Sequence, residues 1–180
     1  MEFRETGLPG AWTLELTPHT DERGLFARIW CRREFQEKGL ATELVQASIS
    51  WNRSRGILRG MHYQAAPFEE DKLVRCIAGR IHDVIIDLRP DSATYCRTAA
   101  VELSAENRRS IYVPKGFAHG FQVLEDGSEV LYHMSEFYAP DHGRGVRWDD
   151  PVFGIDWPLD DPILNLRDRT YPDFDPGRHV

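Results

Sequence analysis

Short segments in which apolar and polar residues alternate follow one another along most of the chain. Turns rich in Gly, Pro, Asp, Asn or Ser separate these segments. A period of two is typical of β-strands, because successive side chains of a strand point to opposite faces of a sheet. The pattern therefore predicts eight strands in the middle of the chain, over residues 44–51, 57–64, 73–77, 81–88, 99–103, 110–113, 117–124 and 129–138.

The N-terminal part of the chain adds two strands and one helix to this prediction. Residues 12–16 alternate and precede a polar turn over 18–24, after which the pattern resumes at 25–30, so we expect an opening hairpin. Residues 32–38 predict a short helix that ends at Gly39. Many short strands with so little helix indicate an antiparallel sandwich or barrel, not a series of alternating strands and helices.

The pattern changes from Pro140 onward, where prolines and aspartates surround isolated apolar residues. We interpret this part as an irregular arm that lies across the barrel, so that residues 1–180 form a single domain. We expect residues 171–180 to fray at the end of the arm. The side chains that are expected to anchor the arm by apolar burial are Trp148, Phe153, Ile155, Trp157 and Leu159.

Composition and charge exclude several classes of protein. The formal net charge of the 180 residues is -7, which argues against a nucleic-acid partner or an anionic membrane surface. No apolar run approaches the roughly 18 residues of a membrane span, and the first ten residues lack the apolar segment of a secretion signal. The three cysteines are widely spaced, without a Cys-x-x-Cys pair. We therefore expect a cytoplasmic protein without disulfides.

The predicted strand over residues 57–64 contains one fixed cation and one imidazole. In strict alternation Arg59 and His62 would point to opposite faces, whereas a bulge at Gly60 would turn both side chains toward one cavity. A functional site is one interpretation of this stretch. The other is an edge strand that carries a solvated arginine and a half-buried histidine.

A second motif begins at Pro114, where Pro-x-Gly-x-x-His ends at His119. It resembles the second motif of the cupin superfamily of double-stranded β-helices, in which the histidine enters a strand at the barrel mouth. Metal-binding cupins carry His-x-His in their first motif, and the corresponding place here reads His62-Tyr63-Gln64. Because a catalytic metal needs about three protein ligands, His62 and His119 are too few, and we expect no metal.

Without a metal, any chemistry must depend on side-chain acids, bases and cations. His62 is the strongest candidate base, and Arg59 and Lys72 could stabilise an oxyanion or bind a diphosphate. Asp83 and Asp87 share a strand face with isoleucines, so a buried carboxylate there needs a partner, for which a histidine N–H is suitable. For Asp87, however, the pattern favours a strand end followed by a turn.

Tyr132 and Asp168 complete the set of candidates. Tyr132 shares a strand face with Val130 and would point inward, where a phenol that stays protonated at neutral pH can donate a proton. A tyrosine at such a position is also compatible with a purely structural place in the core. Asp168 lies in the charge run Arg167-Asp168-Arg169, which by itself looks like a solvated surface.

Taken together, these residues resemble the dTDP-4-dehydrorhamnose 3,5-epimerase family, the metal-free cupin enzymes of deoxysugar nucleotide synthesis. The similarity covers nearly the whole chain, over residues 21–26, 58–64, 72–76, 103–107, 112–121, 138–140 and 150–158. It implies an all-β double-stranded β-helix (jelly roll) with few short helices, no cofactor, and a homodimer in which the strand at 12–16 is suited to exchange.

The resemblance also implies roles for individual residues. His62 would be the general base, oriented by Asp168, and Tyr132 the general acid on the opposite face of a sugar. The residues that would line the substrate site are Arg23, Phe26, Gln46, Arg59, Lys72, His119 and Arg167. The implied reaction inverts C3, C5 or both in a nucleotide-linked 4-keto-6-deoxyhexose. The family example is the conversion of dTDP-4-dehydro-6-deoxy-D-glucose to dTDP-4-dehydro-L-rhamnose.

Three departures from the family pattern leave the substrate open. Position 28 is Arg and position 143 is Gly where the family commonly has Glu, and Gln46-Ala47-Ser48 replaces Gln-x-Asn in a segment that is one residue longer before Gly56. These changes fit the same proton transfer on a related substrate, including a CDP- or GDP-linked sugar. The sequence is also compatible with a cupin 3,4-ketoisomerase, with a metal-dependent cupin such as a dioxygenase, and with a sugar-nucleotide binding module without activity.

Overall fold

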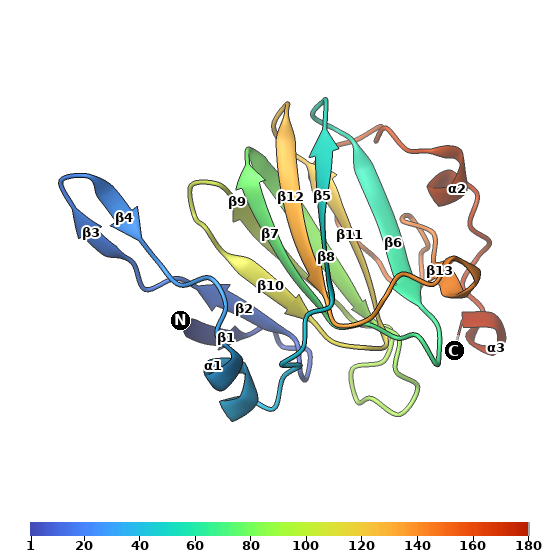
Figure 1. The fold of residues 1–180 in the computed structure, drawn as a ribbon. Helices are drawn as coiled ribbons and strands as arrows, with labels where there is room; N and C mark the ends of the chain where they lie inside the picture. The colour runs from blue at the N-terminus through green and yellow to red at the C-terminus, as the bar shows by residue number, and fades with distance from the viewer. Residues whose placement is uncertain (180) are drawn as a thin grey trace.

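Two β-sheets that share an apolar core form the body of the protein. The computed structural model describes residues 1–179. The first sheet has six strands in the order β1-β2-β10-β7-β12-β5, and the second has five in the order β13-β6-β11-β8-β9 (Figure 1). All named strand pairs are antiparallel. This architecture confirms the predicted all-β jelly roll.

Every segment that was predicted as a strand between residues 44 and 138 contains one; both ends agree for residues 110–113, and at least one end differs in each of the other segments. The strands are β1 Glu2–Glu5, β2 Trp12–Glu15, β3 His19–Asp21, β4 Gly24–Phe26, β5 Gln46–Asn52, β6 Leu58–Gln64, β7 Lys72–Ala78, β8 Arg80–Asp87, β9 Thr98–Ser104, β10 Ser110–Val113, β11 Phe117–Val123, β12 Ser128–Met134 and β13 Gly143–Gly145. The helices are α1 Arg32–Glu37, the 3-10 turn η1 Pro140–His142, α2 Leu166–Arg169 and α3 Pro176–His179.

The predicted N-terminal hairpin is wrong in its pairing. β2 pairs with β1 and β10 inside the first sheet, and the segment that was interpreted as a turn forms β3, which pairs only with β4. β1 was missed because its residues are mostly polar and exposed. Within this one chain, the strand that was described as suited to exchange pairs inside its own sheet, and the β3–β4 hairpin projects from the body (Figure 1). Exchange between subunits stays a prediction.

Apolar side chains from both sheets meet in the main core. Val74 and Val130 of the first sheet pack there with Ile85 and Phe121 of the second, and each is at most 1% exposed. On the outer side of the first sheet, α1 contributes Phe35, the only buried residue of this helix. Gly39 has a φ of 68° just after α1, in agreement with the predicted helix end.

The C-terminal arm covers the outer face of the second sheet. Phe153 is buried against that sheet, and Ile155 and Trp157 pack on the same cluster, as expected for anchors of the arm. β13 was missed because its sequence, Gly-Arg-Gly, carries no apolar pattern. The expected fraying from residue 171 is wrong at Phe174, whose ring contacts Phe153 and whose backbone N–H donates to Asp150. Val180 lies outside the described residues.

No helix in the described part of the chain is long and apolar enough to cross a membrane.

Asp87 ends β8 at the turn that was predicted there. Its fully buried carboxylate accepts hydrogen bonds from the Arg89 guanidinium and from the hydroxyls of Ser92 and Thr94. Burial raises the pKa of this carboxyl, but the bonds from Arg89, Ser92 and Thr94 outweigh burial and lower the pKa to about 2. The folded protein therefore holds this group ionised at pH values where the unfolded chain protonates it.

We expect this carboxylate to contribute on the order of 1 to 2 kcal/mol that is present above about pH 4 and lost as the pH falls toward 2. The reason is that protonation below pH 4 occurs first in the unfolded chain. In urea unfolding, the stability difference between the wild type and Asp87→Asn should therefore shrink from pH 6 to pH 3. A difference that stays constant over this range would contradict the assignment.

Candidate active site

A cavity of about 270 Å³ opens between the two sheets and contains most of the predicted site residues. We call it the reaction pocket. Both sheets and helix α2 contribute to its wall: Arg59 and His62 come from β6, Lys72 from β7, His119 from β11, Tyr132 from β12 and Asp168 from α2. Ser50, Gly120, Phe121 and Asn165 complete the lining.

A bulge in β6 brings Arg59 and His62 to the same pocket. In the pairing with β11, His62 lies opposite His119 and Arg59 lies opposite Phe121, so β6 contains one extra residue between the two pairs. Gly60 has a φ of 123°, and a Cβ at this position would lie 2.6 Å from the Cα of Gly120. Only glycine fits this close approach. The predicted bulge is confirmed, and the alternative of an edge strand is wrong because β6 lies between β13 and β11.

His62 and Asp168 form a hydrogen-bonded pair at the pocket wall. The distance from His62 Nε2 to Asp168 Oδ1 is 2.7 Å, and the backbone N–H of Gly60 donates to Asp168 Oδ2 at 3.0 Å. The carboxylate is 1% exposed, whereas the imidazole is 38% exposed. When Nε2–H donates to the carboxylate, Nδ1 is left without a proton and can act as a base.

The same contacts keep Asp168 ionised. Burial raises the pKa of its carboxyl, but the hydrogen bond and charge of His62, together with the Gly60 N–H, lower it below its ordinary value. Asn165 caps the N-terminus of α2, and its Oδ1 accepts the N–H of Asp168 at 2.8 Å. Asn followed three residues later by Asp is a helix-start pattern, which is the local signal that would have distinguished Asp168 from a solvated charge run.

Tyr132 enters the reaction pocket from the opposite sheet. Burial, together with the negative charge of Asp83, raises the pKa of its phenol well above the ordinary value, although the charge of Arg59 opposes this rise. The phenol is therefore protonated at neutral pH. Within residues 1–179 its hydroxyl has no hydrogen-bond partner, so this proton is available to a bound molecule.

His119 and Asp83 form a second imidazole–carboxylate pair beside the first. Their atoms Nε2 and Oδ2 are 2.8 Å apart, and the side chains are 4% and 0% exposed. This pair confirms that the buried Asp83 needed a partner and that a histidine supplies it. The ring of His119 stands edge-on to Tyr132, with 6.0 Å between the ring centroids.

Two cations border the pocket. Lys72 is 11% exposed at its side chain, and its ammonium pairs with Glu70 at 3.2 Å. The guanidinium of Arg59 donates through Nε to Asn52 Oδ1 at 2.7 Å. Both positive charges therefore lie where negative charge on a bound sugar or a phosphate would be stabilised.

Arg167 lies beside the reaction pocket, whereas Gln46 lies farther out. Arg167 borders a side cavity of about 220 Å³ together with Tyr138 and Gly143, and this cavity shares His62 and Lys72 with the reaction pocket. Gln46 lines neither cavity, but its Oε1 accepts the backbone N–H of Tyr138 at 2.6 Å. This bond connects Gln46 to Tyr138, which lines the side cavity.

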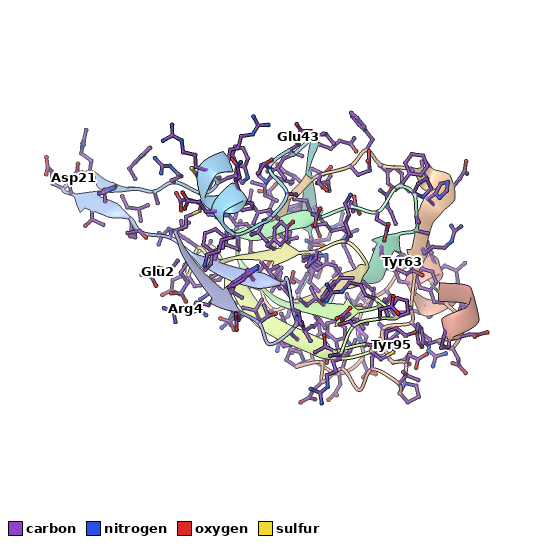
Figure 2. All side chains as sticks on the ribbon, turned by 90° about the horizontal axis from the view of Figure 1, so that it is seen from below. Glu2, Arg4, Asp21, Glu43, Tyr63 and Tyr95 are labelled. Atoms are coloured by element: carbon purple, nitrogen blue, oxygen red, sulfur yellow. The ribbon has the colours of Figure 1, made fainter. Side chains whose placement is uncertain are left out.

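Arg23 and Phe26 lie apart from the reaction pocket within one chain, so their expected place in the substrate site stays a prediction. Both lie in the β3–β4 hairpin, where the Arg23 side chain is 83% exposed and Phe26 is 75% exposed. Figure 2 shows Asp21, at the tip of this hairpin, at the opposite end of the molecule from Tyr63 of β6. The hairpin projects because β3 and β4 pair with each other and with neither large sheet.

The described residues contain no group of three or more His, Cys, Asp or Glu side chains that is arranged to hold a metal ion. An imidazole with a carboxylate behind it can remove a proton, a phenol on the facing sheet can supply one, and nearby cations can stabilise the anion formed between these steps.

Comparisons with known proteins agree with this geometry. The family model described as dTDP-4-dehydrorhamnose 3,5-epimerase matches residues 5–176. The chain is 46% identical over 175 residues to the dTDP-4-dehydrorhamnose 3,5-epimerase of Methanothermobacter thermautotrophicus, covering 94% of each chain. The crystal structure of the enzyme of that name from Elizabethkingia anophelis is 38% identical, with a TM-score of 0.94 and 97% and 96% of the two chains covered.

A third relative was solved with a ligand. It is the dTDP-6-deoxy-D-glucose-3,5-epimerase of Legionella pneumophila in complex with dTDP-4-keto-L-rhamnose, which is 34% identical, with a TM-score of 0.87 and 93% and 89% of the two chains covered. The family match over nearly the full length and these identities lead to one conclusion. The chain belongs to the dTDP-4-dehydrorhamnose 3,5-epimerase family of isomerases.

Proposed function

We propose that this protein, acting as one domain over residues 1–180, inverts C3, C5 or both in a nucleotide-linked 4-keto-6-deoxyhexose. The observation that carries the proposal is the arrangement of the reaction pocket, in which His62 with its partner Asp168 and Tyr132 line the same cavity from different sheets. A sugar bound between them would have a base near one face and an acid near the other.

The first step is removal of a proton from carbon. A ketone at C4 acidifies the hydrogens on C3 and C5, because the electron pair left behind is delocalised into the carbonyl as an enolate. His62 takes the proton at Nδ1, and Asp168 stabilises the imidazolium that forms. Lys72 and Arg59 stabilise the enolate oxygen or the diphosphate of the nucleotide.

The second step returns a proton to the opposite face of the same carbon. Tyr132 donates its phenolic proton to the enolate, and the configuration of the carbon is inverted. The ketone stays at C4, and neither the oxidation state of the sugar nor its bond to the nucleotide changes. The reaction needs only these proton transfers.

The dTDP-linked sugar is the proposed substrate for two reasons. A relative that matches nearly the whole chain is named dTDP-4-dehydrorhamnose 3,5-epimerase, and another was solved with dTDP-4-keto-L-rhamnose. The test is to incubate the protein in D₂O with dTDP-, CDP- and GDP-linked 4-keto-6-deoxyhexoses and to locate the label by NMR. Deuterium at C3 or C5 with the ketone still at C4 is the expected result. A ketone that moves to C3 would identify a ketoisomerase, and binding without label would identify a module without activity.

A second copy of the chain completes the site in this proposal. β5 is an unpaired edge of the first sheet, and its side chains Ile49 and Trp51 are 60% and 57% exposed. Exposed apolar residues on an open edge strand favour association. A homodimer that brings the projecting hairpin of one subunit to the pocket of the other would supply Arg23 and Phe26 to the substrate.

We expect two inactive variants to restore each other's activity when they are co-expressed. His62→Asn removes the base of its own site, and Arg23→Ala removes the residue that this chain lends to its partner. In a mixed dimer one site has an intact base and an intact hairpin, so random pairing should recover about a quarter of wild-type activity. Co-expression that recovers no activity, or a monomer by analytical ultracentrifugation at micromolar concentration, would rule out the shared site.

A further inference from the structure

Asn52, the last residue of β5, has a fully buried side chain that makes three hydrogen bonds. Its Nδ2 donates to the backbone oxygens of Ser50 at 3.0 Å and Ser128 at 3.1 Å, and its Oδ1 accepts from Arg59 Nε at 2.7 Å. The two donated bonds fix the orientation of the amide, because exchanging its oxygen and nitrogen would place an acceptor against two carbonyls. The oxygen therefore faces Arg59.

This contact fixes the direction of the guanidinium. Arg59 also donates from one terminal nitrogen to the backbone oxygen of Trp51 at 3.4 Å. A guanidinium has five N–H groups in a planar fork, so these two bonds leave three of them, all on its two terminal nitrogens. Arg59 lines the reaction pocket, and its charge acts on Tyr132 across that pocket.

We propose that Asn52 is a positioning residue, which holds the guanidinium of Arg59 so that its terminal N–H groups face the substrate. This inference rests on the proposed function of the reaction pocket. Asn52 lies in the segment before Gly56 that is one residue longer than the family pattern. An arginine side chain is otherwise free to rotate about several bonds, and fixing Nε removes most of that freedom before a ligand arrives.

The competing explanation is that Asn52 only stabilises the pairing of β5 with β12, where it lies opposite Ser128. A double-mutant cycle separates the two roles. We would measure kcat/KM and, by calorimetry, the affinity for dTDP in the wild type, Asn52→Ala, Arg59→Lys and the double variant. Lysine keeps the positive charge but has no Nε–H group that Asn52 could orient.

We expect Asn52→Ala to lower at least one of these two quantities about tenfold when Arg59 is present, and less than about twofold when Lys replaces it. The same factor in both backgrounds would show that Asn52 acts only on the fold and would overturn the proposal. If no sugar nucleotide is epimerised, the proposed function fails, but the cycle on dTDP affinity still shows whether Asn52 and Arg59 are coupled. In that case, if Asn52→Ala changes the dTDP affinity by the same factor with Arg59 and with Lys at position 59, the positioning role is overturned as well.

Asn107→Ala is the matched control. The Asn107 side chain also makes three hydrogen bonds, with the backbone of Ser104, Arg109 and Glu102, but it lines neither the reaction pocket nor the side cavity. Its loss should lower the melting temperature without changing kcat/KM. If Asn52→Ala does not fold, Asn52→Ser takes its place in the cycle, because its hydroxyl can still donate to a strand carbonyl but is too short to replace the bond to Nε.

Discussion

Replacing His62 with Asn will lower the rate at which solvent deuterium enters the sugar by on the order of 10³-fold. Asn fills similar space and can still donate a hydrogen bond to Asp168, which His62 contacts at 2.7 Å. It has no nitrogen that can accept a proton at neutral pH. The measurement is NMR of the sugar nucleotide in D₂O, with the melting temperature recorded to establish that the variant is folded.

His82→Asn serves as the control for this prediction. His82 is half-buried on β8, but it lines neither the reaction pocket nor the side cavity. Burial lowers the pKa of its imidazole, so this side chain is predominantly neutral at pH 7 and its replacement adds or removes little charge. Its exchange rate should match that of the wild type. Exchange that persists in His62→Asn at the wild-type rate would show that another group is the base.

Tyr132→Phe will separate exchange from inversion. With the phenol removed, His62 can still take a proton from the sugar and return a deuteron to the same face, so label enters without a change of configuration. We expect the rate of product formation to fall by about 10² to 10⁴, and the rate of label incorporation to fall much less. One NMR time course reports both quantities, because the epimers have different ring couplings.

The outcome that excludes Tyr132 as the acid is formation of the epimer by Tyr132→Phe at close to the wild-type rate. Tyr112→Phe provides a comparison, because it removes a buried hydroxyl that bonds to Asp71, outside the reaction pocket. That variant should lose stability and keep its activity. Equal losses of exchange and inversion in Tyr132→Phe would indicate that the phenol takes part in the first step.

Local patterns predicted those parts of the fold that depend on burial. Seven of the eight strands from β5 to β12 place apolar residues on a buried face, which leaves a period of two in the sequence. β5 also alternates, but its apolar side chains Ile49 and Trp51 are exposed at the edge of the first sheet. The bulge in β6 was predictable for a related reason. Gly60 lies between Arg59 and His62, and a bulge at this glycine brings both side chains to the same side of the strand.

The parts that the sequence did not predict are those that depend on partners far along the chain. β13 has one buried residue, and its backbone is held by β6, which comes much earlier in the sequence. β1 pairs with the strand that directly follows it and was missed for a different reason, because its side chains are mostly polar and exposed. The contact of His62 with Asp168 joins residues that are 106 positions apart, so only the resemblance to the family indicated it. Arg23 and Phe26 lie on the projecting hairpin. In the proposed dimer their surroundings depend on a second subunit, which the sequence of one chain does not describe.

The separation between His62 and its carboxylate has a consequence for newly synthesised chains. A ribosome that has released residue 145 has delivered every strand of both sheets, but Asp168 and the Asn165 cap that holds it are still to come. A polypeptide that ends before α2 would therefore contain both sheets around the reaction pocket, but its His62 would lack the Asp168 carboxylate. The histidine therefore gains its carboxylate partner only after α2 has been synthesised, when both sheets are already present.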